Sequence, residues 1–123
     1  MEEQAMNWIY DQRSGRMTGP TGVEHTGYSG SPTHRNNPAS EAIRNNGPIP
    51  RGTYAIDTAV SDRRGPVTIR LTPVGHSAHG RSGFLIHGEN ARTLGASSQG
   101  CIILNRQARD AIHDSGSTTL IVR

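Results

Sequence analysis

Residues 83–104 read GFLIHGENARTLGASSQGCIIL. The stretch contains two short apolar segments, 83–87 and 100–104, and both are typical of buried strands. Each segment carries one reactive side chain at its edge, His87 at the end of the first and Cys101 at the start of the second. A thiol and an imidazole held on neighbouring strands are sufficient for acyl transfer, because the thiolate attacks a carbonyl while the imidazole moves the proton.

The composition predicts a single small domain that is mainly β. The chain has 123 residues, of which only 32% are hydrophobic, so its core is thin. Its 15 glycines and 7 prolines fall between short apolar runs, as in β-rich domains with many turns. We expect a β-sandwich or barrel-like domain over residues 6–123, with one or two short helices, and a flexible N-terminus over 1–5.

The periodicity and the turn signals place the individual elements. Asn37 and Pro38 are typical of a helix start, and Asn105 precedes a second helical pattern that Gly116 ends. Strands are predicted at 8–12, 16–18, 22–28, 53–56, 67–72, 83–87, 100–104 and 117–122, and helices at 37–44 and 105–113.

The charge distribution narrows the class of partner. The net charge is +3, but the arginines are scattered from Arg13 to Arg123 and form no tract, which argues against nucleic-acid binding. An anionic polymer or a peptide with carboxylates is compatible with this charge. The start of the chain has no basic segment followed by an apolar one, and no apolar run reaches membrane-spanning length. We therefore expect a protein made in the cytoplasm without a signal peptide and not inserted into a membrane.

The lone cysteine has two interpretations. A single Cys is often a small buried apolar residue, and His87 could be a packed histidine bonded to a carbonyl. The context favours a functional thiol: Gly100 allows a substrate to approach closely, the Gly100 and Cys101 amides can point at an oxyanion, and Ser98 can hold the turn.

Metal and cofactor chemistry are disfavoured. His76, His79 and His87 could be read as metal ligands, but there is no second cysteine and no His-Glu-x-x-His helix. A phosphate-binding strand–glycine–helix motif is missing from the sequence as well. We expect no metal and no organic cofactor.

The order of these residues resembles a known family. His87-Gly88 followed by Ser98-Gln99-Gly100-Cys101-Ile102 is similar to the catalytic signature of the L,D-transpeptidase (YkuD-type) family, and 47–54, GPIPRGTY, is similar to its Pro-x-Pro-x-Gly-Thr-Tyr stretch. From about residue 6 to the C-terminus, the chain looks most like the L,D-transpeptidase-related effectors of type VI secretion systems, which lack signal peptides. The matching stretches are 8–10, 27–30, 36–38, 47–50 and 81–88.

The resemblance implies an activity and a set of partners. Cys101 would be the nucleophile and His87 the base, with Gly100, Ser98 and Gly88 shaping the site. The substrate would be the stem peptide of peptidoglycan, cut between meso-diaminopimelate and D-alanine, with carboxypeptidase, D-amino-acid exchange or cross-linking as outcomes. A secretion-apparatus component or adaptor would deliver the protein to the periplasm of a target cell, and a cognate immunity protein would block the site.

Two positions depart from the family pattern. Gln99 stands where many members have histidine, and Ile103 stands where many have an arginine near the substrate. Candidate substrate contacts are Gln99 and three arginines that could replace the missing guanidinium: Arg81, Arg92 and Arg106.

The sequence is also compatible with two other functions. A cysteine endopeptidase that cuts the peptide bridges of the wall would use the same Cys101 and His87. A wall-binding or secretion-apparatus module with a vestigial site would leave Cys101 unreactive.

Overall fold

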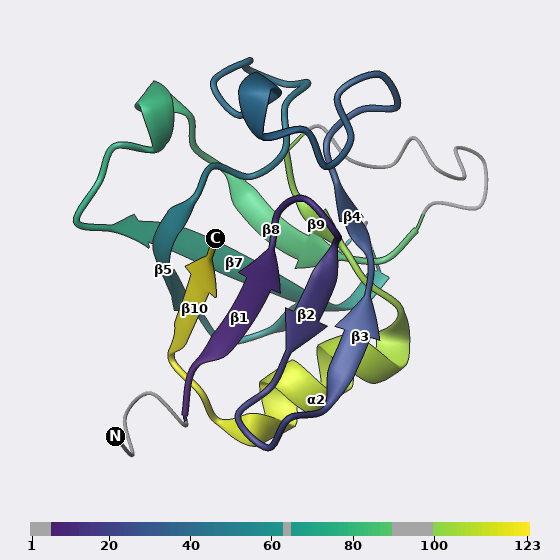
Figure 1. Cartoon of the computed structure of the whole chain (residues 1–123). Coiled ribbons are helices and arrows are strands. Elements are labelled where there is room, and N and C mark those ends of the chain that lie inside the picture. Colours follow the sequence, from purple (N-terminus) through teal and green to yellow (C-terminus); the bar gives the residue numbers. More distant parts are fainter. Residues whose placement is uncertain (1–5, 63–64, 90–99) are drawn as a thin grey trace.

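The computed structural model describes residues 6–62, 65–89 and 100–123 and forms a nearly closed, barrel-like sheet (Figure 1). The elements are β1 (Trp8–Asp11), β2 (Arg16–Thr18), β3 (Glu24–Thr26), β4 (Tyr28–Ser29), η1 (Pro38–Ser40), β5 (Gly52–Ile56), β6 (Val60–Asp62), β7 (Gly65–Val74), η2 (Ala78–Gly80), β8 (Phe84–His87), β9 (Ile102–Ile103), α2 (Arg106–Ser115) and β10 (Thr119–Val122). The predicted mainly β fold class is confirmed.

The sheet closes through one short segment of chain. Its strand order is β3-β2-β1-β10-β5-β7-β8-β9-β4, so β3 and β4 stand at opposite ends of the order. Only Gly27 separates them in the sequence. A Cβ on Gly27 would lie 1.9 Å from the carbonyl oxygen of Ile103, so a side chain would push the closing segment off the neighbouring strand.

The core fills the inside of this sheet. Alternate residues of the strands point inward, and the largest fully buried side chains include Trp8, Tyr10, Tyr54, Phe84 and Ile86. The helix α2 closes one end and contributes Ala108 and Ile112 to the core. The side chain of Asn105 caps it by accepting from the Ala108 amide at 2.9 Å, as predicted, and Gly116 ends it in the left-handed conformation. No helix within the described residues is long and apolar enough to cross a membrane.

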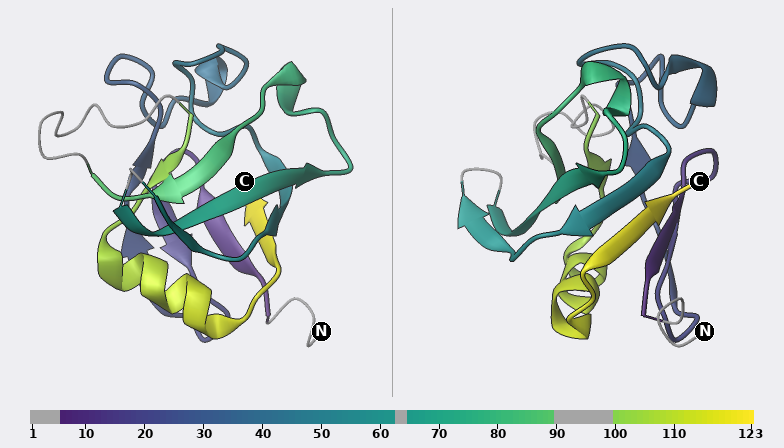
Figure 2. Two further views of the ribbon diagram at one scale, coloured as in Figure 1. Left: turned by 180° about the vertical axis from the view of Figure 1, so that it is seen from behind. Right: turned by 90° about the vertical axis from the view of Figure 1, so that its left-hand side faces the viewer.

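The loops that carry η1 and η2 lie at the end of the barrel opposite α2 (Figure 2). The predicted helix over 37–44 is wrong in length: Asn37 does cap a helix, but regular helix is limited to the 3₁₀ turn Pro38–Ser40. The cause is visible at Glu41, whose carbonyl oxygen would accept from the Asn45 amide in an α-helix. Here it accepts from the guanidinium of Arg81 instead.

Arg81 is a buried clamp on this loop. Its side chain is 6% exposed, and besides Glu41 it donates from Nη1 to the carbonyl of Pro48 at 2.8 Å and from Nη2 to that of Gly47 at 2.9 Å. The segment 41–48 has few regular backbone bonds of its own, so this guanidinium satisfies three carbonyls that would otherwise be buried without a donor.

Glu41 joins the same loop to three other parts of the barrel. Its carboxylate accepts from Arg51 Nε and the Gln12 side chain, both at 2.9 Å, and lies 2.9 Å from His79 Nε2. Burial raises the pKa of Glu41, but these hydrogen bonds outweigh burial and lower the pKa to about 2. Glu41 therefore stays ionised at pH 7 and holds β1, β5 and η2 against the loop.

Several sequence predictions need small corrections. The strand predicted at 22–28 is split at Gly27 into β3 and β4, because the two halves pair with different neighbours, β2 and β9. The strand predicted at 67–72 extends to Gly65–Val74. The sequence did not predict β6, which pairs with β7 in a short hairpin.

We predict that Arg81→Met lowers the free energy of unfolding by roughly 2–5 kcal/mol, because it leaves buried carbonyls without a donor. Urea denaturation at pH 7 measures this. Arg106→Met is the matched control, since Arg106 is exposed and pairs only with Asp110 on the same helix, and it should change stability by less than about 0.5 kcal/mol. Equal effects of the two substitutions would contradict the clamp.

A second prediction concerns acid stability. The pKa of Glu41 in the folded protein, about 2, lies below its ordinary value. The contribution of the Glu41 carboxylate to the free energy of unfolding is therefore present above about pH 4.5 and is lost as the pH falls towards 2. Glu41→Gln should lower stability at pH 7 and flatten the loss between pH 4.5 and 2 in urea titrations. Glu24→Gln, at an exposed strand position, should keep the wild-type slope; an unchanged slope in Glu41→Gln would refute this role.

Candidate active site

A parallel strand pair brings the segments that carry His87 and Cys101 side by side. Ile86 of β8 lies opposite Ile102 of β9, and His87 lies opposite Ile103. Ile86 and Ile102 are fully buried in the core. Because faces alternate along a strand, His87 leaves β8 on the side away from these two residues. Cys101 directly precedes β9, next to Ile102.

The imidazole of His87 is held in one orientation. Its Nδ1 lies 2.9 Å from the carbonyl oxygen of Gly88, and the ring is 9% exposed. A carbonyl can only accept, so Nδ1 carries the proton and the lone pair of the neutral ring is on Nε2. An imidazole in this tautomer can take a proton through Nε2.

Gly88 also leaves room for a second buried arginine. A Cβ at this position would lie 2.8 Å from Arg109 Nη2. The guanidinium of Arg109, on α2, donates from Nε to the carbonyl of Leu104 at 3.1 Å and from Nη1 to that of Pro66 at 2.6 Å. It thereby ties the residue after β9 to the helix and to β7, directly beside Gly88. The sequence did not predict this support for His87.

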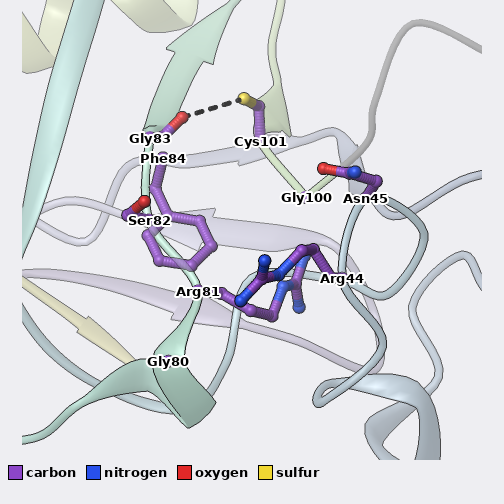
Figure 3. Close-up of a pocket in the computed structure, with 9 residues that line it drawn as sticks. All are labelled: Arg44, Asn45, Gly80, Arg81, Ser82, Gly83, Phe84, Gly100 and Cys101. Atoms are coloured by element: carbon purple, nitrogen blue, oxygen red, sulfur yellow. Dashed lines mark hydrogen bonds between the residues drawn. The ribbon is translucent and has the colours of Figure 1, made fainter.

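Cys101 lies just before β9 and is partly exposed. Its Sγ is 3.9 Å from the carbonyl oxygen of Gly83, a weak thiol hydrogen bond (Figure 3). The preceding Gly100 has a φ of 129°, and a Cβ there would lie 2.4 Å from Arg81 Nη2. Only glycine fits between the cysteine backbone and the arginine clamp.

Ser29 also helps to fix the peptide before Cys101. Ser29 Oγ lies 3.5 Å from the Gly100 carbonyl and accepts from the Ile49 amide at 2.8 Å. Ser29 is fully buried. It links the closing strand β4, the 47–50 stretch and the cysteine loop; the resemblance includes it in the 27–30 stretch but predicts no role for it.

Two cavities share a lining residue next to the thiol. The smaller, of about 190 Å³, is lined by Arg44, Asn45, Gly80, Arg81, Ser82, Gly83, Phe84, Gly100 and Cys101 (Figure 3). The larger, of about 820 Å³, is lined by Asp57, Thr58, Val60, Thr68, Arg70, Gly83 and Leu85. Gly83 lines both, and its carbonyl oxygen lies 3.9 Å from Cys101 Sγ.

The predicted substrate-contacting residues lie in different parts of the chain relative to the thiol. Arg81 does line the smaller cavity, but at least three of its N–H groups are engaged by backbone carbonyls. Arg106 is on α2, pairs with Asp110 at 2.9 Å and does not line either cavity, so the structure does not bring it to the thiol. Arg92, Ser98 and Gln99 lie outside the described residues.

Arg44 and Asn45 are cavity residues that the sequence analysis missed. The Asn-Asn-Gly turn signal at 45–47 locates a loop there, but it does not say which wall of the barrel the loop faces. Asn45 adopts a left-handed conformation with a φ of 64°. That turn places it and Arg44 across the cavity from Phe84.

The histidines considered as metal ligands point to separate partners. His76 Nε2 lies 2.9 Å from the Thr53 carbonyl, and His79 Nε2 lies 2.9 Å from Glu41 Oε2. In the described part of the chain, no group of three or more His, Cys, Asp or Glu side chains is arranged to hold a metal ion.

Comparisons with known proteins agree with this architecture. A solved L,D-transpeptidase from Mycobacterium smegmatis is similar in fold, with a TM-score of 0.55 and 17% sequence identity over 95% of this chain. The match covers 58% of that protein, so this chain spans a little over half of its length. No curated protein matches the chain. The Tlde1 domain family matches residues 24–121, which include both His87 and Cys101 and most of the barrel. The chain therefore belongs to the Tlde1 domain family, the family of type VI L,D-transpeptidase effectors.

Proposed function

We propose that this chain is a cysteine-dependent L,D-carboxypeptidase and D-amino-acid exchange enzyme that acts on the tetrapeptide stems of peptidoglycan. Family membership supports a peptidoglycan-related effector and an enzyme of the L,D-transpeptidase type. The observation that supports the specific reaction is the parallel β8–β9 register, which brings the segments of His87 and Cys101 side by side, together with an oriented imidazole and a cavity lined by Cys101.

In the first half-reaction, His87 Nε2 takes the proton of Cys101 as Sγ attacks the carbonyl carbon between diaminopimelate and D-alanine. The carbonyl oxygen becomes an oxyanion, for which the Gly100 and Cys101 amides are the candidate donors. When the oxyanion collapses, the C–N bond breaks, and the imidazolium gives its proton to the departing amine of D-alanine. A thioester between Cys101 and the shortened stem remains.

In the second half-reaction, an acceptor resolves the thioester. Water gives net hydrolysis: His87 takes a proton from water, the oxygen forms a new bond to the carbonyl carbon, and the C–S bond breaks. The proton then returns to the thiolate. The amine of a free D-amino acid gives exchange by the same sequence, with a new C–N bond in place of C–O.

Arg81 contributes charge to this site. Burial lowers the pKa of Arg81, and nearby groups that include the thiol of Cys101 raise it. Guanidinium stays protonated in proteins, so a fixed positive charge lies on one side of the cysteine. That charge stabilises negative charge on the sulfur during attack and release. Arg81 is therefore a positioning and electrostatic residue in this mechanism and not the ligand of a substrate carboxylate.

The biological setting follows from the family. We propose that the protein is delivered by a type VI secretion system, through an apparatus component or adaptor, and acts in the periplasm of a competing cell. An immunity protein in the producing lineage would block the cavity that Cys101 lines. Loss of D-alanine from tetrapeptide stems would remove donors for wall cross-linking.

The nucleophile is tested by intact-protein mass spectrometry. After brief mixing with a purified tetrapeptide muropeptide, the wild-type protein should gain the mass of the stem minus D-alanine. Cys101→Ala should gain nothing and release D-alanine at least about a thousandfold more slowly, because no thioester can form. Ser14→Ala, at an exposed position in the β1–β2 turn that lines neither cavity, is the control and should keep the adduct. An adduct in Cys101→Ala, or full turnover without the thiol, would contradict the mechanism.

The base is tested separately. His87→Gln should lower kcat/KM by about 10²–10⁴ and slow alkylation of Cys101 by iodoacetamide, because the thiol loses its proton acceptor. His113→Gln, on the exposed side of α2, should leave both rates unchanged. If His87→Gln reacts with iodoacetamide and with substrate at wild-type rates, His87 is not the base.

A further inference from the structure

The smaller cavity is lined by a cation, Arg44, whose side chain has no partner among the described residues. Arg44 is exposed, and its guanidinium makes no hydrogen bond or ion pair with any described residue. Figure 3 shows both Arg44 and Arg81 among the side chains that line the cavity. Most surface arginines face bulk water, whereas this one lines a cavity that also contains the nucleophile.

The charge of this cavity is unbalanced. None of the described residues that line it is acidic. Glu41, on the same loop as Arg44, is engaged by Arg51, Gln12 and His79. A cavity lined by two arginines and by no described carboxylate favours an anion, and a guanidinium matches a carboxylate in shape and hydrogen bonding.

The size of the cavity limits what the anion belongs to. The smaller cavity, of about 190 Å³, has room for one small residue such as alanine. The larger cavity, of about 820 Å³, offers more room for the rest of a stem peptide, and Gly83 lines both cavities.

We propose that the smaller cavity binds the D-alanine on the leaving-group side of the scissile bond, with its terminal carboxylate on Arg44. This rests on the proposed function and adds to it a specificity: the enzyme selects stems that end in a free carboxylate. The diaminopimelate side of the stem then occupies the larger cavity, and the scissile carbonyl lies over Cys101.

The same pocket serves the exchange reaction. An incoming D-amino acid enters with its carboxylate on Arg44 and its amine towards the thioester. The amine nitrogen forms the new bond to the carbonyl carbon, the C–S bond breaks, and the proton of the amine passes through His87 to the thiolate. A stem whose fourth residue is amidated, or is extended by a cross-link, lacks the carboxylate in this position.

The test compares two donor substrates in the intact protein. One is a synthetic tetrapeptide stem that ends in D-alanine, and the other is identical but ends in D-alaninamide. The wild type should cleave the acid with a kcat/KM roughly 10–100 times that for the amide, as expected for a hydrogen bond to a charged group. Arg44→Ala should lower kcat/KM for the acid by the same factor and leave the amide unchanged. Arg13→Ala, a matched exposed arginine in the β1–β2 turn, should keep the wild-type preference.

The outcomes separate this inference from the function on which it rests. If the wild type cleaves neither stem and forms no thioester on Cys101, the proposed function fails. If both stems are cleaved without preference, or if Arg44→Ala keeps the preference, the reaction stands and the role of Arg44 is overturned. The activity of Arg44→Ala on the amide shows that the variant is folded.

Discussion

The site depends on the buried guanidinium of Arg81. It binds three backbone carbonyls of the 41–48 loop and lies so close to Gly100 that no side chain fits between them. One side chain therefore fixes the loop that carries Arg44, the backbone that precedes Cys101 and the wall of the smaller cavity. A positive charge in this position is held by geometry and needs no carboxylate partner, so it remains available to the sulfur.

The barrel contributes the other constraint, the parallel pairing of β8 and β9. Closure through Gly27 places β4 against β9 and so holds that strand against β8, with Ser29 beneath the Gly100 peptide. The reactive pair thus depends on residues at distant points of the chain. Gly83 lines both the smaller cavity, with its two arginines, and the larger cavity.

Local pattern was enough to predict much of this. Apolar runs and turn residues predicted the mainly β class and most strands, the cap at Asn105 predicted α2, and the two short apolar segments predicted where His87 and Cys101 stand. The predicted length of the first helix was wrong, because the carbonyl of Glu41 accepts from Arg81, forty residues further along the chain. Arg44 was missed for a similar reason: an exposed arginine before a turn looks the same whether it faces water or the nucleophile. Arg106 lies on α2 and pairs with Asp110, and closeness to Cys101 in the sequence does not determine which way the side chains of α2 point.

In the proposed reaction Cys101 acts on the last peptide bond of a tetrapeptide stem. Muropeptide analysis by mass spectrometry tests this on purified Gram-negative sacculi after incubation with the protein. We expect uncross-linked tetrapeptide stems to become tripeptides, while cross-linked dimers keep their bridges. Sacculi in which the dimers are cut and the tetrapeptides persist would contradict it and would indicate an endopeptidase. An unchanged profile would indicate a wall-binding module.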